Sequence, residues 1–199
     1  MPRTSPPAPQ PTSAAPGLDR AATLLRDTRL LSTAAASFLA VQLFGNLYEE
    51  VVTNAANIAD PRVAGLGGEL SPGSPLYYYL PWAPLGVVLV AILTVRLGRL
   101  AAPSWIVRRL AGALAALAVA VVSKVLLITR INPLFRDPTI AVESLREAAI
   151  TWAFVNGVAI LAVTTALALL LSWRGRVLDI AAPGPTGAHT GPGLEGDVR

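Results

Sequence analysis

The sequence predicts an all-α integral membrane protein, a bundle of four transmembrane helices with both termini in the cytoplasm. Composition, four long apolar segments and the placement of arginine point to this class. Hydrophobic residues make up 53% of the chain and charged residues 14%, with a mean hydropathy of +0.56, whereas soluble domains contain about 25% charged residues. The apolar segments have no polar face over about 20 residues, the length that crosses a bilayer.

The composition also excludes several function classes. The chain contains no cysteine, which rules out disulfides, thiolate metal sites and paired-cysteine redox chemistry. Its single histidine, His189, lies in a Gly/Pro/Thr-rich tail, so imidazole ligation of zinc or haem within the membrane is not expected. Nucleotide-binding, nucleophile-elbow and zinc-protease motifs are absent from the sequence. We therefore expect no metal and no cofactor.

The N-terminal segment precedes the first apolar run. Residues 1–18 are rich in Pro, Ser and Ala with almost no large apolar side chain, and such a composition does not offset the entropy of ordering. Residues 1–29 are therefore predicted to be a disordered basic cytoplasmic arm with its juxtamembrane segment. The first apolar run starts near Leu30, behind a long polar segment and without a clean cleavage site, so it is predicted to remain as a helix rather than act as a signal peptide.

Four helices are predicted within a transmembrane domain of residues 30–173, at about 30–52, 78–97, 106–128 and 149–173. Each can span, because 20 helical residues cover about 30 Å. Residues 174–199 contain a Gly/Pro-rich stretch and are predicted to form a disordered cytoplasmic tail.

Charged residues near the helix ends predict the orientation. Basic residues gather on the side assigned to the cytoplasm, at Arg20, Arg26, Arg29, Arg96, Arg99, Arg108, Arg109, Arg174 and Arg176. Acidic residues gather on the opposite side, at Glu49, Glu50, Asp60, Glu69, Asp137, Glu143 and Glu147. Cytoplasmic loops carry the excess of basic residues, so all three loops agree with cytoplasmic termini. The formal charge of +4 thus reflects topology, and no nucleic-acid partner is expected.

A polar stripe runs along the end of the first helix. Its members recur at spacings of three and four residues and are Asn46, Glu50, Thr53, Asn54 and Asn57. Buried polar groups in a membrane usually pair or line a wet cavity, because inserting one costs about 2–3 kcal/mol. Glu49 and Glu50 have two interpretations: they mark the outer end of the span, or they act inside it.

Two further helices place polar groups at the same depth. Lys124, the only lysine, either snorkels to the headgroups or pairs with Glu49 or Glu50; a substrate anion could occupy the same position. Trp152 and Asn156 share a face of the fourth helix. Together with Asn46 these residues either form an outward-facing ligand pocket or hold the helices together by hydrogen bonds.

The first external loop ends in Tyr77-Tyr78-Tyr79, followed by Trp82. Tyrosine and tryptophan at this place are typical of an interfacial belt. The alternative is that the rings, Tyr78 among them, line an aromatic pocket.

Four segments together resemble the anthrone oxygenase-like family of small four-helix membrane proteins: N-L-Y-E-E-V-V, Y-Y-Y-L-P, I-N-P-L-F and W-A-F-V-N. The resemblance covers roughly residues 30–173. It implies cofactor-independent oxygenation of a polycyclic phenol, with Glu49 or Glu50 as the base that removes a proton. Trp152 and the tyrosines would stack on the rings, and Lys124 or Asn156 would stabilise the enolate oxygen.

Two function classes follow, and the sequence does not decide whether the chain is an enzyme. The first is a membrane protein that binds a lipid or hydrophobic small molecule in the outward-facing pocket, with an accessory subunit of a larger complex as a variant; the second is the oxygenase. We slightly favour binding. The expected partners are the bilayer, such a small molecule and further copies of this chain. Arginine outnumbers lysine fifteen to one and alanine is abundant, a bias typical of GC-rich bacteria, which predicts a bacterial plasma membrane.

Overall fold

The computed structural model describes residues 16–64, 79–100 and 102–181, and the regular structure in these ranges is entirely helical. Four long helical rods make up the fold. The first rod consists of α1 (Pro16–Tyr48), the π-helical segment η1 (Glu49–Asn54) and α2 (Ala55–Ala59). The short helix α3 (Pro61–Ala64) follows this rod. The other three rods are α5 (Trp82–Arg99), then α6 (Ser104–Leu126) with π-helical η2 (Leu127–Ile131) and α7 (Asn132–Arg136), and finally α8 (Val142–Ala181).

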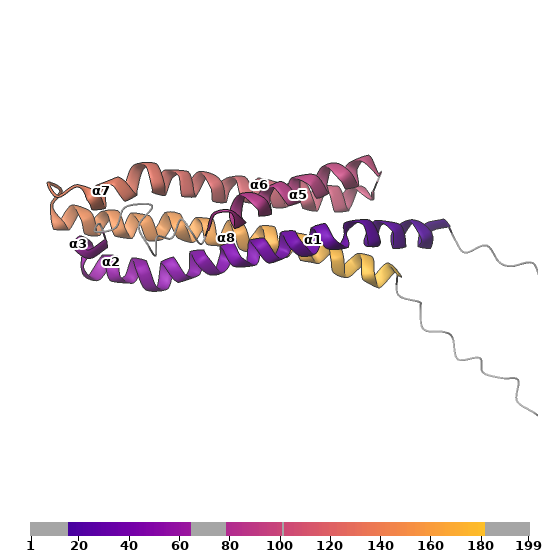
Figure 1. Cartoon of the computed structure of the whole chain (residues 1–199), viewed down its shortest axis with the longest axis horizontal. Coiled ribbons are helices and arrows are strands. Elements are labelled where there is room, and N and C mark those ends of the chain that lie inside the picture. The colour runs from indigo at the N-terminus through magenta and orange to yellow at the C-terminus, as the bar shows by residue number, and fades with distance from the viewer. Residues whose placement is uncertain (1–15, 65–78, 101, 182–199) are drawn as a thin grey trace, which may run out of the picture.

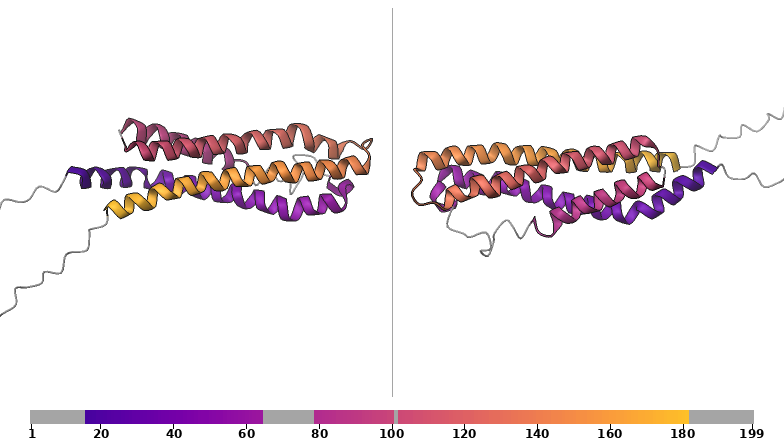
Figure 2. Two further views of the ribbon diagram at one scale, coloured as in Figure 1. Left: turned by 180° about the vertical axis from the view of Figure 1, so that it is seen from behind. Right: turned by 90° about the horizontal axis from the view of Figure 1, so that it is seen from above.

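The rods lie side by side, and both ends of the described chain lie at one end of the bundle, which we call the terminal end (Figure 1). The opposite end, with α3 and α7, is the loop end. α1 and α6 each pack against both α5 and α8, so α1 and α6 are diagonally opposite. α5 is the shortest rod and stops well before the loop end (Figure 2).

Buried residues recur along the rods at alternating spacings of four and three. In α1 and η1 they are Thr28, Ser32, Ala35, Leu39, Gln42, Asn46 and Glu49. In α8 they are Trp152, Asn156, Ala159, Val163, Ala166, Leu170 and Trp173. A repeat of about 3.5 residues is the pattern of left-handed helix packing. The same seam that buries leucine and alanine therefore also carries polar side chains into the interior.

Large apolar side chains cover the outside of the bundle. In the most apolar stretch of each candidate span only 22–33% of the residues are buried, and Leu30, Phe44, Val51 and Phe154 are more than two-thirds exposed. Four helices are long and apolar enough to cross a membrane: Thr28–Ala59, Trp82–Arg99, Ser104–Arg136 and Val142–Trp173. This supports the prediction of a multi-pass helical membrane protein, because soluble domains rarely expose so much contiguous apolar surface.

The helix boundaries differ from the predicted ones. α1 begins at Pro16, well before the predicted helix start near Leu30. Proline is favourable at the first helical position, and residues 17–29 contain Ala, Leu and Arg but no further proline. α8 begins at Val142 and ends at Ala181, two residues before Pro183, where a proline ring would disrupt the helix. The predicted disorder of residues 1–15 and 182–199 lies outside the described residues.

Side chains fasten the loop end. The Arg62 guanidinium donates to the backbone carbonyl of Asp137, 3.3 Å away, and to that of Ile140. In the turn before α8, the hydroxyl and backbone N–H of Thr139 donate to the Asp137 carboxylate at 2.6 and 2.8 Å. These hydrogen bonds lower the pKa of the Asp137 carboxyl.

Candidate functional site

A layer of polar side chains crosses the interior of the bundle between two apolar clusters. On the third rod the terminal-end cluster stops at Ala120 of α6, and the loop-end cluster starts at Leu127 of η2. On α8 the two clusters are separated between Ala159 and Trp152. Six residues make up what we call the polar layer: Asn46, Glu49, Glu50, Tyr79, Lys124 and Asn156. Five of the six come from the candidate spans themselves, and the structure brings polar residues of different helices together.

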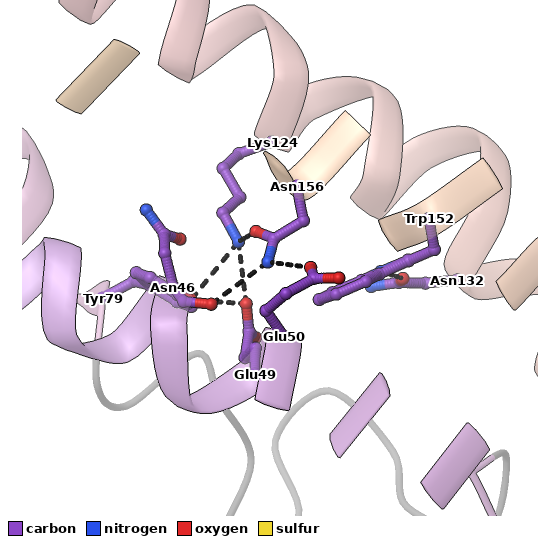
Figure 3. A network of polar contacts seen from close by, with 8 residues as sticks. All are labelled: Asn46, Glu49, Glu50, Tyr79, Lys124, Asn132, Trp152 and Asn156. Carbon is purple, nitrogen blue, oxygen red and sulfur yellow. Dashed lines mark hydrogen bonds and ion pairs between the residues drawn. The ribbon is translucent and has the colours of Figure 1, made fainter. Parts of the chain in front are cut away.

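Lys124 is the centre of the polar layer (Figure 3). Its ammonium Nζ lies 2.7 Å from Oε2 of Glu49 and donates to Oδ1 of Asn156 at 2.8 Å. The Lys124 and Glu49 side chains are only 17% and 9% exposed. The pairing alternative for Lys124 is therefore the observed one, with Glu49 as the partner, and Lys124 does not snorkel. The ion pair also joins η1 to α6 across the diagonal of the bundle.

Tyr79 adds a third element to the same contact. Its hydroxyl donates to Oε2 of Glu49 and also lies 3.3 Å from the Lys124 ammonium. The ammonium in turn sits 4.6 Å from the centre of the Tyr79 ring, within cation–π range. Tyr79 reaches the layer because the chain enters α5 there, close to Gly45, where a Cβ would lie 3.4 Å from the ring. An alanine Cβ at position 45 would make ordinary van der Waals contact with the Tyr79 ring.

Asn156 connects the two glutamates. Its Nδ2 donates to Oε2 of Glu50 at 2.8 Å and to the backbone carbonyl of Asn46 at 3.1 Å, while its Oδ1 accepts from Lys124. The residue is completely buried. Both ends of the amide are thus hydrogen-bonded, which fixes its orientation and holds α8 against α1 and α6.

Trp152 forms the wall of the layer on the loop-end side. Its indole N–H donates to Oδ1 of Asn132 at 3.1 Å, and its ring centre lies 5.5 Å from the Lys124 ammonium. Glu50 and Trp152 extend toward each other from η1 and α8 (Figure 3). Because Asn132 fixes the ring edge, the ring face stays directed at the charged groups.

The two π-helical segments lie beside the polar layer. In η1 the buried residues Glu49 and Asn54 are five positions apart, the spacing of a π-helical turn, where an α-helix would place the fourth residue on that face. Thr53 and Asn57, which α-helical spacing puts on the stripe, are accordingly only half-buried. η2 follows Lys124 by three residues. π-bulges inside α-helices are frequent at functional sites.

Some buried polar atoms have no hydrogen-bond partner among the described residues. They are Gln42 Oε1, both amide atoms of Asn46, Asn54 Oδ1 and Trp173 Nε1. An unpaired buried polar group costs about 1–3 kcal/mol. All of these atoms except Trp173 Nε1 lie in α1 and η1. This part of the bundle is therefore not optimised for helix adhesion alone.

The charges of the polar layer do not balance. One ammonium, that of Lys124, faces the carboxylates of Glu49 and Glu50. Among the described residues Glu50 accepts one hydrogen bond, from Asn156, and no cation lies within ion-pair distance of it. Glu49 is thus a neutralised, hydrogen-bonded carboxylate, and Glu50 is the carboxylate with free acceptor capacity.

The structure describes the positions of most of the predicted site residues. Asn46, Glu49, Glu50, Lys124, Trp152 and Asn156 lie together, as predicted. Tyr78 lies outside the described residues, and its neighbour Tyr79 is the tyrosine in contact. Sequence reasoning also missed Gln42 and Asn132, although Gln42 is one turn before Asn46 and Asn132 is part of the I-N-P-L-F segment.

Comparison of the chain with protein-family models, with curated proteins and with solved structures finds no match. The resemblance to the anthrone oxygenase-like family thus stays a hypothesis.

Proposed function

We propose that this chain is a multi-pass protein of the bacterial plasma membrane that binds a hydrophobic small molecule or lipid by its polar group at the polar layer. The observation that carries the proposal is the Lys124–Glu49–Asn156 contact, buried at the depth of the candidate spans. A charged side chain at such depth costs several kcal/mol unless it is paired, and apolar residues would pack the same space at no such cost. A ligand that binds at this contact best explains why charged residues occupy this depth.

The proposed orientation has both termini in the cytoplasm. It is supported by the arginines at the terminal end, such as Arg99 and Arg109, and by the position of both described chain ends there. In this orientation the polar layer lies toward the outer side. α5, with 18 residues, covers about 27 Å, and Tyr79 at its start brings an aromatic ring to the layer. The ligand would therefore enter from the outer side.

A second candidate function is the cofactor-independent oxygenase that the sequence resemblance implies. One observation favours it: Glu50 has free acceptor capacity and faces the Trp152 ring, the arrangement that a base beside a stacked aromatic substrate requires. In that reaction Glu50 takes the proton and Lys124 or Asn156 faces the enolate oxygen. Glu49 is the weaker candidate base, because Lys124 and Tyr79 already occupy its carboxylate.

The proposal is tested by identifying small molecules that copurify with the full chain in mild detergent, using mass spectrometry. We expect one amphiphilic compound at near-stoichiometric amount with the wild type and at least about tenfold less with Glu50→Gln. Glu143→Gln, an exposed carboxylate at the start of α8, is the matched control and should retain the compound. Equal amounts in all three preparations would contradict binding at the polar layer. Conversion of the compound on incubation in air by the wild type alone would favour the oxygenase.

A further inference from the structure

The chemistry of the polar layer also indicates which polar group its ligand carries. We propose that the layer binds the ammonium group of an amphiphilic amine, held by the Glu50 carboxylate and the Asn54 amide oxygen beside the Trp152 ring. This inference rests on the proposed binding function and adds the ligand class.

The net charge of the polar layer favours a cationic ligand. Lys124 is matched by Glu49 at 2.7 Å, so Glu50 leaves the layer with one excess negative charge when all three groups are ionised. An anionic ligand would add a second unpaired charge in a low-dielectric interior, which is costly. A cation beside Glu50 balances the layer. The sequence-based idea of a substrate anion at Lys124 is therefore replaced, since Glu49, Asn156 and Tyr79 already surround that ammonium.

The hydrogen-bond acceptors of Glu50 and Asn54 independently favour a ligand that donates hydrogen bonds. Asn54 is 2% exposed, and its Oδ1 is buried without a donor among the described residues. Asn54 follows Glu50 by four residues in the same helical segment, and Ile58, four residues further on, packs against the loop-end cluster that contains Trp152. The Asn54 carbonyl oxygen and the Glu50 carboxylate both accept hydrogen bonds, so neither can donate one to the other. A primary ammonium supplies three donors, which matches what this face lacks.

The aromatic wall is the third argument. The Trp152 face already lies 5.5 Å from one ammonium, that of Lys124, and indole is the best cation–π partner among the side chains. Its N–H is held by Asn132, so the ring is oriented before a ligand arrives. Glu50 is the more accessible of the two glutamates, and the next residue, Val51, is 71% exposed. The apolar body of an amphiphile can thus lie along the outside of η1 while its ammonium reaches Glu50.

The test compares three probes that differ only in the head group: decylammonium, decanol and decanoate. Their binding to the full chain in dodecylmaltoside is measured by isothermal titration calorimetry at neutral pH. We expect decylammonium to bind at least about tenfold more tightly than decanol, and decanoate to bind weakest. Glu50→Gln should abolish the preference for the ammonium, and Asn54→Leu should reduce it. Glu143→Gln should leave it unchanged, and thermal unfolding of each variant verifies that it is folded.

The outcomes separate this inference from the proposed function. Glu50-dependent binding in which decanol or decanoate equals or exceeds decylammonium would overturn the ammonium assignment and leave ligand binding intact. If no probe distinguishes wild type from Glu50→Gln and no compound copurifies, the proposed function fails as well. Competition of decylammonium by phosphatidylethanolamine, against phosphatidylcholine in nanodiscs, would support the ammonium site and identify a lipid headgroup as its source. Decylammonium binding that phosphatidylethanolamine does not reduce would support the site and point to a free amine.

Discussion

At the scale of single residues, the decisive contact is the ion pair between Lys124 and Glu49. Neither residue could be assigned a partner from sequence alone, because Glu49 and Glu50 are adjacent and α-helical spacing favoured Glu50 for the stripe. η1 changes this, since the π-helical turn carries both Glu49 and Asn54 to the interior. The sequence thus predicted which residues converge, and the backbone irregularity determined how they pair.

Removing either partner of this pair leaves a buried charge uncompensated. We expect Lys124→Met and Glu49→Gln each to destabilise the protein by about 3–5 kcal/mol, whereas the double variant should be less destabilised than the sum of the two. Reversible unfolding in mixed micelles measures the three values against wild type. A coupling near zero would mean that the contact does not contribute to the folded state. Glu143→Gln, at an exposed carboxylate at the start of α8, provides a baseline variant.

At the scale of the helices, the positions of the four apolar segments were predictable and the helix ends were not. Apolar runs of about 20 residues predicted the four candidate spans, whereas the spacing of about 3.5 residues between buried residues such as Leu110, Leu117 and Leu170 is seen only in the structure. The continuation of α1 back to Pro16 was not predicted, since polar helices beyond an apolar span lack a hydropathy signal. α5 likewise begins at Trp82, a few residues after the predicted helix start at about residue 78.

Close approach of α1 and α5 depends on Gly86. A Cβ at that position would lie 3.0 Å from Cδ2 of Leu39 and 3.6 Å from Cβ of Phe38. We expect Gly86→Val to cost about 1–3 kcal/mol by overpacking, with the melting temperature as the readout. Gly98→Ala is the control, because a Cβ added there would meet no described atom within 4 Å beyond its own stretch of helix, and alanine favours a helix by about 1 kcal/mol. A similar loss in both variants would disprove close packing at Gly86 as the cause.

At the scale of the whole molecule, the topology follows from the two ends of the bundle. The native chain contains no cysteine, so single cysteines report accessibility without background. Thr139 is exposed at the loop end and Ser104 is exposed at the terminal end. In intact cells an impermeant maleimide should label Thr139→Cys readily, and Ser104→Cys only after permeabilisation. The reverse pattern would invert the proposed orientation and place the polar layer toward the cytoplasm.

The central claim is that the polar layer exists for a ligand and not for adhesion between helices. The most direct test replaces the layer by apolar residues in one variant: Glu49→Leu, Glu50→Leu, Lys124→Met and Asn156→Leu. Because replacing a whole buried polar group by apolar packing is often neutral or stabilising, we predict a melting temperature at or above wild type, measured together with loss of the copurifying compound. If the variant melts well below the wild type and the wild type retains no compound, the polar layer serves adhesion between helices and not a ligand.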